Sequence, residues 1–329
     1  MTEETIAKIA VSAATYWLDK PYDYLIPEVM RGAVQPGMRV LVPFSRGNKL
    51  CEGIVLHLGY ESEYEEKLKP IYSVLDEAPV LTDRQLKLAL WMHDRFFCTV
   101  YEAIKAILPV GIWFNSDGVR RVKDKTVEMI SLAVSAEEAY SVSQAKKRKA
   151  PQQASLLELL CSTGRVSARE ALCFTGASRQ SLNALIKAEL IDASFDEAFR
   201  RPEFRHVEQQ QIPELNSEQQ NAYSGLKALM DSGKPQAALL FGVTGSGKTS
   251  VYVHLISDVL SSGGSAILLV PEISLTPQMI RTFTGFFGDT VAVLHSSLTV
   301  GQRYDEWKRI KQGKAHVVIG TRSAIFAPV

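Results

Sequence analysis

The stretch GVTGSGKTS, residues 242–250, decides the fold of the C-terminal part of this chain. It lies between an apolar run, QAALLFGV (236–243), and a segment of helical periodicity, KTSVYVHLISDVLSSG (248–263). A G-x-x-x-x-G-K-T pattern between a buried strand and a helix is typical of a phosphate-binding loop, because its glycines let backbone amides face the phosphates at a helix N-terminus. The sequence therefore predicts a nucleotide site here.

The loop and one glutamine upstream supply the predicted nucleotide contacts. Lys248 would neutralise the β- and γ-phosphates and the Thr249 hydroxyl would bind Mg²⁺, so both are expected to act in catalysis. The Gln219 amide, in LNSEQQ (215–220), can pair with an adenine edge. ATP and Mg²⁺ are the expected cofactors, and the predicted contacts are Gln219, Gly242, Val243, Thr244, Gly245, Ser246, Gly247, Lys248, Thr249 and Ser250.

Strand-like apolar runs alternate with amphipathic segments from residue 206 to residue 329. Strands are predicted at 236–243, 265–272, 290–297 and 315–321, and helices at 248–263, 276–288 and 299–313. Such alternation indicates a parallel α/β sheet with right-handed crossovers. We therefore expect residues 206–329 to form the N-terminal part of a RecA-like P-loop lobe.

Small hydroxyl and charged residues follow two of these strands. Open α/β sheets bind their ligands beyond the carboxyl ends of the strands. Arg322 and the neighbouring amides are suited to a phosphate. We expect DNA contacts in a motor lobe from Pro271, Glu272, Thr276, Thr321, Arg322 and Ser323.

A nucleotide motor also needs an acidic element after the loop, to position Mg²⁺ and water. Asp76 and Glu77 lie far upstream of the loop. Asp305 and Glu306 fall inside an amphipathic helical segment, where we expect them to form a solvated face. We therefore expect the motor to be truncated, with the chain ending at Val329 before the acidic element.

Residues 1–112 read as short strands followed by helices. Strand candidates are TIAKIAVSA (5–13), YDYLIP (22–27), MRVLVPF (38–44), EGIVLHL (52–58) and KPIYSVLD (69–76). Gly37 lies in a turn where a positive φ costs little, and Thr82 is the expected N-cap of the helical repeat at 82–97. The pattern predicts a small β-rich, barrel-like domain closed by helices.

Residues 113–205 begin with a polar, weakly periodic stretch that reads as a linker up to about residue 150. Its basic run, Lys146, Lys147, Arg148 and Lys149, is either part of a solvated linker or a contact to the DNA backbone. Three short helices and an extended tail then predict a winged helix, although generic helical domains share this pattern. The fold class is therefore multidomain, α+β and α/β.

Composition excludes several classes of protein. The 329 residues carry a net charge of +1, so DNA binding would depend on local patches rather than on bulk charge. The four cysteines have no zinc-knuckle spacing and are expected to be buried free thiols. No signal peptide, metal site or membrane span is predicted, and the expected setting is cytoplasmic.

Seven motifs occur together in a characteristic order: YDYLIP, GMRVLVPF, LNSEQQ, GVTGSGKTSVY, LVPEISLTPQM, LHSSLT and VIGTRSAIF. With them the whole chain resembles the primosomal replication-restart DNA helicases, the primosomal protein N′ (PriA) family. The resemblance implies a 3′-to-5′ superfamily-2 helicase. It implies a 3′-DNA-end-binding domain at 1–112, a winged helix at 113–205 and part of helicase lobe 1 at 206–329.

The resemblance also implies residue roles and partners. Tyr22 and Asp23 match the residues that read a DNA 3′ end, Lys69 matches a nearby basic residue, and Ser45 stands where the family usually has glycine. Expected partners are forked DNA with a free 3′ end, single-stranded DNA, other primosome proteins and single-stranded-DNA-binding protein, with no membrane. Zinc is expected only in a region beyond Val329.

Two other functions remain open. The chain could be a non-catalytic module that binds fork-structured DNA and keeps its P-loop domain for structural reasons. It could also be a P-loop kinase or transferase, although more than 200 residues precede the loop. A GTPase is not favoured, since no N-K-x-D base-reading motif follows the loop.

Overall fold

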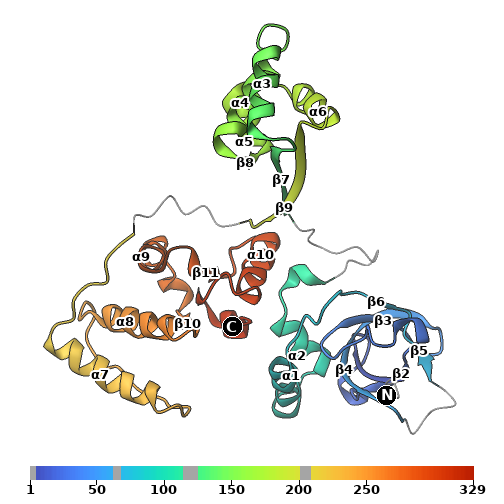
Figure 1. Ribbon diagram of the computed structural model, residues 1–329. Coiled ribbons are helices and arrows are strands. Elements are labelled where there is room, and N and C mark those ends of the chain that lie inside the picture. Colours follow the sequence, from blue (N-terminus) through green and yellow to red (C-terminus); the bar gives the residue numbers. More distant parts are fainter. Residues whose placement is uncertain (1–4, 62–67, 114–124, 201–208) are drawn as a thin grey trace. The chain divides into compact units, whose positions relative to one another are not determined.

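The computed structural model describes residues 5–61, 68–113, 125–200 and 209–329 (Figure 1). The chain divides into two compact units. One contains residues 1–119 together with 204–329, and the other contains residues 120–203. No helix in the described ranges is long and apolar enough to cross a membrane.

The N-terminal part of the first unit is a curled six-stranded sheet with the strand order β5-β2-β1-β4-β3-β6 (Figure 1). β1 lies antiparallel between β2 and β4, and Ile9, Val40 and Val55 are fully buried in its core. The predicted strand at each of the five positions is confirmed. The strands are β1 (Ile6–Val11), β2 (Tyr22–Leu25), β3 (Arg39–Phe44), β4 (Lys49–Gly59), β5 (Lys69–Pro70) and β6 (Ser73–Val74).

Two helices, α1 (Asp83–Arg95) and α2 (Val100–Ile107), follow the sheet. Thr82 caps α1 as predicted, and Thr99 caps α2 in the same way, each in a capping box with the residue three positions later. The predicted turn at Gly37 has φ +84°, and a Cβ there would lie 2.3 Å from the carbonyl oxygen of Leu81. Glycine is therefore required at this turn.

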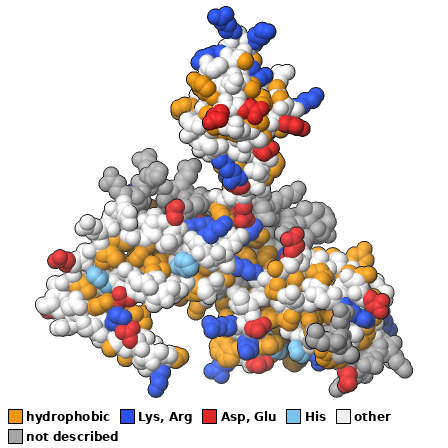
Figure 2. Space-filling model, viewed as in Figure 1, with side chains coloured by type: hydrophobic (Ala, Val, Ile, Leu, Met, Phe, Trp, Pro, Cys, Tyr) orange, Lys and Arg blue, Asp and Glu red, His pale blue; other side chains and the backbone are white. Residues whose placement is uncertain are grey.

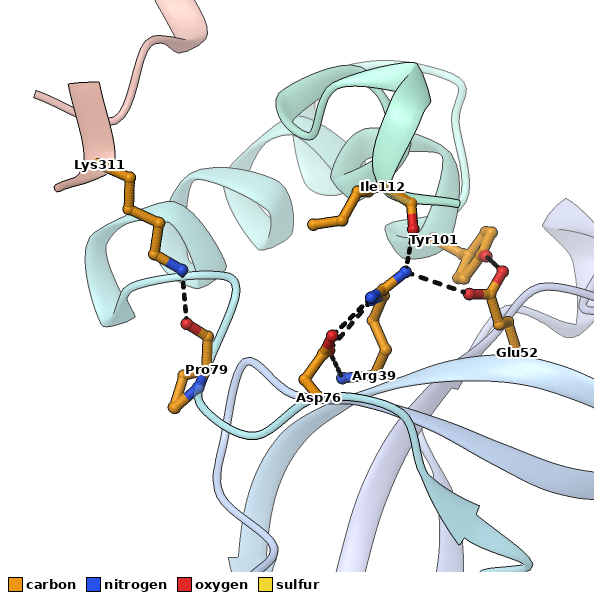
Figure 3. Close-up of polar contacts among 7 residues, drawn as sticks. All are labelled: Arg39, Glu52, Asp76, Pro79, Tyr101, Ile112 and Lys311. Carbon is orange, nitrogen blue, oxygen red and sulfur yellow. Dashed lines mark hydrogen bonds and ion pairs between the residues drawn. The ribbon is translucent and has the colours of Figure 1, made fainter. Parts of the chain in front are cut away.

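A buried ion network joins the sheet to these helices (Figure 3). Arg39 of β3 has no exposed surface and donates from Nε to Asp76 Oδ2 at 3.0 Å. It also donates to the carbonyl oxygen of Ile112, in the short 3-10 helix η4 (Val110–Ile112). Its Nη1 lies 3.6 Å from Glu52 Oε1, and Tyr101 of α2 donates to the same carboxylate at 3.4 Å. The network therefore connects β3, β4, α2 and η4.

The second unit packs four helices beside an antiparallel sheet of order β8-β7-β9. Its core is separate from the others and includes Ile130, Leu157 and Leu185. The expected helix ends at Gly164 and Gly176 are confirmed. The elements are β7 (Lys125–Leu132), α3 (Ala136–Lys146), α4 (Pro151–Thr163), β8 (Arg165–Ser167), α5 (Ala168–Thr175), α6 (Arg179–Lys187) and β9 (Ile191–Ala198).

The predicted linker up to residue 150 is wrong over most of its described length, because it contains β7 and α3. The helical pattern of α3 is weak, since its buried positions are the small residues Ala139 and Ser143. The basic run therefore lies at the end of α3 and in the turn before α4. Figure 2 shows Lys and Arg side chains projecting from the end of the unit where Figure 1 places this turn.

The C-terminal part of the first unit contains a parallel sheet of order β10-β12-β11. Apolar residues of α8 and α9, among them Val253 and Phe283, pack on it. The elements are α7 (Ser217–Asp231), α8 (Lys248–Ser261), β10 (Ala266–Leu269), η5 (Glu272–Ser274), α9 (Pro277–Phe287), η6 (Gly288–Thr290), β11 (Val291–Leu294), α10 (Val300–Lys311), β12 (Val317–Gly320) and η7 (Arg322–Phe326).

The predicted buried strand at 236–243 is wrong. These residues form no strand, and the side chains of Leu239, Phe241 and Val243 are 87%, 90% and 76% exposed. An apolar run forms a parallel strand only beside a partner strand. Within the described residues no strand pairs with this segment, although its apolar pattern is that of a buried strand.

The predicted solvated face at Asp305 and Glu306 is also wrong, because each residue is only 2% exposed. Arg309, one turn later in α10, donates to Glu306 Oε1 at 2.8 Å. Glu306 Oε2 also accepts from the backbone amide of Val293 at 3.1 Å. Buried carboxylates need such partners, so Glu306 holds α10 against β11 and is not an acidic element of the nucleotide site.

The prediction for the cysteines is half right. All four are free, but none is fully buried, and Cys173 is exposed. Cys51 and Cys161 pack against the edges of the cores.

Candidate DNA-terminus and nucleotide sites

Three of the predicted terminus-reading residues converge at one corner of the N-terminal sheet. Tyr22 begins β2, and its ring lies edge-on to Phe44 at a centroid distance of 5.1 Å. Ser45 directly follows Phe44 at the end of β3. Lys69 lies in β5, where its backbone is paired with Tyr24 of β2. Its Nζ donates to the carbonyl oxygen of Ser45 at 2.6 Å. The fold therefore brings Tyr22, Ser45 and Lys69 together.

Asp23 belongs to the same corner but to the other face of β2. Tyr22 and Tyr24 both pack on the core of the sheet, and side chains alternate between faces along a strand. Asp23 therefore projects from the opposite face, where it lies across from Lys8 of β1. The Asp23 carboxylate and the Tyr22 ring are therefore neighbours only at the start of β2.

Ser45 has φ +58°, in the left-handed region that favours glycine. Its carbonyl oxygen accepts from Lys69 Nζ and also from the amide of Asn48, at 3.3 Å. The backbone thus keeps a glycine-like turn although serine carries a side chain. The exposed Ser45 side chain adds a hydroxyl to this turn.

The two tyrosines of β2 remain neutral at physiological pH. Burial raises the pKa of Tyr22, and the nearby Asp19 carboxylate raises it further. Burial raises the pKa of Tyr24 as well, and its hydroxyl donates to the carbonyl oxygen of Pro43 at 3.2 Å. Neither tyrosine therefore adds a negative charge beside Lys69 and Asp23.

The glycine-rich loop has the backbone shape that its sequence predicts. Gly245 and Gly247 both have φ +81°, and Gly247 begins α8 without any side-chain cap. The first amides of α8 are therefore left for a ligand. At this φ any other residue would be strained, and a Cβ at Gly247 would also displace the end of the Gln219 side chain, whose Nε2 would lie 2.2 Å away.

Gln219 contacts the loop itself. Its Nε2 donates to the carbonyl oxygen of Ser246 at 3.1 Å, and its side-chain oxygen accepts from the amide of Asn216 at 3.0 Å. Lys248 Nζ donates to the carbonyl oxygens of Gly242 and Val243 at 2.7 and 2.8 Å. The loop, its uncapped helix and this ammonium suit a triphosphate, whose oxygens can replace the two carbonyls as partners of Lys248.

The two predicted motor-lobe turns lie side by side at the carboxyl edge of the parallel sheet. Leu269 of β10 is in register with Gly320 of β12, so η5 and η7 leave the sheet as neighbours. Arg322 Nη2 lies 3.3 Å from Glu272 Oε1 across these turns. The backbone amide of Glu272 and then Arg322 lower the pKa of the Glu272 carboxyl.

The other residues of this edge differ in exposure. Pro271 and Ser323 are exposed, whereas Thr321 is only 6% exposed and starts η7. The Thr276 hydroxyl accepts from the amide of Met279 at 3.2 Å and thereby caps α9. The exposed groups of this edge are therefore Pro271, Ser323, the Arg322–Glu272 pair and Thr276, whose hydroxyl also caps α9.

Sequence reasoning missed an exposed aromatic group next to the terminus corner, formed by Tyr16, Trp17 and Phe97. YWL (16–18) carries no predicted role, and RFF (95–97) is only the end of the helical repeat predicted at 82–97. The sequence signal for this group is a pair of adjacent aromatic residues, as in Tyr16–Trp17, in a segment without the alternation of a strand.

Two family descriptions match this chain. The family described as 3'DNA-binding domain (3'BD) matches residues 8–109, and the one described as Type III restriction enzyme, res subunit, matches residues 212–329. The replication restart protein PriA of Bacillus subtilis is 32% identical over 98% of this chain and 47% of its own length. Those of Chlamydia trachomatis and Haemophilus influenzae are 31% and 32% identical over 95% and 97% of this chain.

The chain belongs to the replication restart protein PriA family. It spans less than half the length of the PriA relatives named above, at 47%, 41% and 42%. The 3'DNA-binding match includes Tyr22, Asp23, Ser45 and Lys69. The restriction-enzyme-type match, a helicase-type domain, includes the glycine-rich loop and both motor-lobe turns. The resemblance based on the seven motifs is therefore confirmed.

Proposed function

We propose that this chain is the DNA-end-reading and nucleotide-binding part of an ATP-dependent 3′-to-5′ DNA helicase of replication restart. The observation that carries the proposal is the convergence of Tyr22, Ser45 and Lys69 inside a stretch similar to a 3'DNA-binding domain. A helicase-type match over the glycine-rich loop supplies the motor half of the proposal.

The terminus corner suits the 3′ end of a nascent leading strand. The half-exposed Tyr22 ring would stack on the terminal base, which is independent of sequence. Lys69 would hold the adjoining phosphate. With the terminal nucleotide at the start of β2, which Tyr22 and Asp23 share, a free 3′-hydroxyl would donate to the Asp23 carboxylate. An internal phosphodiester would be repelled by that carboxylate, so Asp23 would distinguish ends from continuous strands.

The loop would bind Mg²⁺-ATP, which supplies the free energy for strand separation when the motor is complete. Its amides and Lys248 would hold the phosphates, Thr249 would bind the metal ion, and Gln219 would turn from Ser246 to the adenine edge. The residues at the carboxyl edge, including Arg322, would follow the DNA backbone. We further propose that residues 206–329 are RecA-like and that 113–205 are a winged helix that contacts duplex DNA.

The isolated chain would bind ATP weakly and hydrolyse none. Among the described acids after the loop, Glu272 is engaged with Arg322, Glu306 with Arg309, and Asp258 with the Tyr223 hydroxyl. None of these three is therefore available to orient water beside Mg²⁺. Zinc ligands, other primosome proteins, single-stranded-DNA-binding protein and a cytoplasmic setting belong to the proposal for the whole protein.

The decisive test compares DNA forks that end in a 3′-hydroxyl with the same forks ending in a 3′-phosphate. Fluorescence anisotropy should show tighter binding of the 3′-hydroxyl fork. The ratio of the two affinities should fall about 10- to 100-fold in Asp23→Ala, as expected for loss of one charge-assisted hydrogen bond. Glu28→Ala, on the same domain with an 84% exposed side chain, is the matched control and should keep the preference. A preference that survives Asp23→Ala contradicts the terminus-reading role.

One observation favours the non-catalytic fork-binding module as a second candidate. The segment before the loop, with Leu239 and Phe241 exposed, does not support the loop from within a sheet. Lys248→Ala separates the two functions. Unchanged fork binding with and without ATP, in this variant and in the parent chain, would favour the module. DNA-independent phosphate transfer to a small acceptor would instead favour a kinase or transferase.

A further inference from the structure

Three aromatic side chains form an exposed group on the N-terminal domain. Tyr16 and Trp17 lie in the 3-10 helix η1 (Tyr16–Leu18), and Phe97 lies in the turn between α1 and α2. Their exposed fractions are 40%, 90% and 95%. Two nearly fully exposed large aromatic rings in one place are unusual on a protein surface and indicate a contact with a partner.

The rings are arranged around Tyr16. Its centroid lies 5.8 Å from that of Trp17, with the ring planes at 79°, and 6.0 Å from that of Phe97, with the planes at 54°. Trp17 and Phe97 thus each lie beside the Tyr16 ring. Their largely exposed faces remain available to planar ligands.

Polar contacts fix this group in position. Asp19 Oδ2 accepts from the amide of Val100 at 2.7 Å and lies 3.3 Å from His93 Nδ1. The same His93 nitrogen is 2.8 Å from the carbonyl oxygen of Cys98, and the His93 ring lies 6.2 Å from that of Tyr16. η1 is therefore anchored on the α1–α2 turn, so a ligand would not have to order these rings.

The surroundings favour single-stranded DNA over a protein as the occupant. Lys20 and Arg95 are exposed and flank the group in sequence, which suits phosphates on both sides. Only residues 19–21 separate η1 from Tyr22 at the start of β2, so the group adjoins the corner proposed for the DNA terminus. All three rings fall within the stretch similar to a 3'DNA-binding domain.

We infer that Tyr16, Trp17 and Phe97 form a stacking platform for the bases that immediately precede the 3′-terminal nucleotide. This inference rests on the proposed terminus-reading function and extends it by a second contact. Stacking accepts any base, so the platform adds affinity for a single-stranded 3′ tail without sequence preference. It would also require a few unpaired nucleotides before the end.

The test uses the full chain and a labelled single-stranded decamer with a 3′-hydroxyl. Trp17→Ala and Phe97→Ala remove rings that pack little, and each should weaken binding about 5- to 100-fold, whereas Trp17→Phe keeps a ring and most of the affinity. Tyr60→Ala is the matched control. Tyr60 is 56% exposed in the same domain, beyond the end of β4 that pairs with Ile6, away from η1. It should leave affinity unchanged.

A second decamer, with abasic sites at the two or three nucleotides before the last, isolates the stacking. On this DNA Trp17→Ala and the parent chain should bind alike. Equal affinity of the parent chain, Trp17→Ala and Phe97→Ala for the intact decamer overturns the platform and assigns the rings to a protein contact. An unchanged loss caused by Trp17→Ala on abasic DNA also overturns it.

The platform and the terminus-reading proposal fail in different ways. Asp23→Ala should change the ratio of affinities for 3′-hydroxyl and 3′-phosphate ends, whereas Trp17→Ala should weaken both by the same factor. If Trp17→Ala loses affinity but the parent chain shows no preference for the 3′-hydroxyl end, the terminus-reading proposal is contradicted and the platform is supported.

Discussion

The guanidinium of Arg39 is fully buried and binds both Asp76 and the carbonyl oxygen of Ile112. Truncation in Arg39→Ala leaves the Asp76 carboxylate buried without its main partner. Breaking a buried pair in this way costs about 3–5 kcal/mol, so urea unfolding should show a large loss of stability. Arg179→Ala is the control, because its pair with Glu128 is partly exposed and should contribute less than about 1 kcal/mol. Equal effects of the two variants would contradict the prediction.

Glu52 in the same network predicts a pH dependence. Burial raises the pKa of its carboxyl above the ordinary 4.5, against the lowering effect of Arg39. The folded state therefore binds this proton more tightly than the unfolded state does. The stabilisation is fully present below pH 4.5 and is lost as the pH rises through the raised pKa.

Glu52→Gln should remove that loss, because a neutral amide occupies the same volume and still accepts from Tyr101. As the pH rises from acid to neutral, the unfolding free energy of Glu52→Gln should increase relative to that of the parent chain. Chemical unfolding at several pH values measures it. A variant that is less stable than its parent at pH 7 would show that the ion pair with Arg39 outweighs desolvation.

At the scale of the element, the start of α2 depends on Thr99. Its hydroxyl accepts from the amide of Glu102 at 3.1 Å, and its own amide donates to Glu102 Oε2 at 2.8 Å. Thr99→Ala should lose about 0.5–2 kcal/mol of stability, while Thr99→Ser keeps the cap. Thermal unfolding at neutral pH compares the two.

The bonds that the Thr99 amide and then the Thr99 hydroxyl donate to Glu102 Oε2, at 2.8 and 3.0 Å, lower the pKa of the Glu102 carboxyl. Their contribution is therefore present above the ordinary pKa of 4.5 and lost as the pH falls through the lowered value. The difference between Thr99→Ala and Thr99→Ser should shrink in acid. A constant difference across this range would exclude the capping box as its origin.

For the segment at 236–243 we expect substitutions to have little effect on stability. Because Leu239 and Phe241 are exposed, Leu239→Ser and Phe241→Ser should change the stability of this chain by less than about 0.5 kcal/mol. Ile319 of β12 is fully buried, and Ile319→Ala should cost about 2–5 kcal/mol. A large loss in either serine variant would place the segment inside a sheet.

At the scale of the whole molecule, separate cores predict separate unfolding. The core around Leu157 lies entirely within residues 120–203. Leu157→Ala should therefore lower the stability of that unit by about 2–5 kcal/mol and leave the other transition in place. Calorimetry with limited proteolysis can assign each transition. A single transition that shifts as one would show that the two units unfold together.

The sequence by itself determined the features that depend on neighbouring residues. The helix caps at Thr82 and Thr99 rest on hydrogen bonds within three positions, and the positive φ of Gly37, Gly245 and Gly247 depends on the glycine itself. Such contacts are encoded in short patterns, because hydrogen bonds at these sites join residues close in the chain. The seven motifs are likewise short stretches of sequence, and their order was sufficient to indicate the PriA family.

Only the tertiary structure decided which of these features meet and which are buried. The Lys69–Ser45 bond, the Arg39 network, the burial of Glu306 and the exposure of Phe241 each depend on a partner distant in the chain, or on the lack of one among the described residues. Burial is set by the strands and helices that pack on a residue, and a short sequence pattern does not specify these partners.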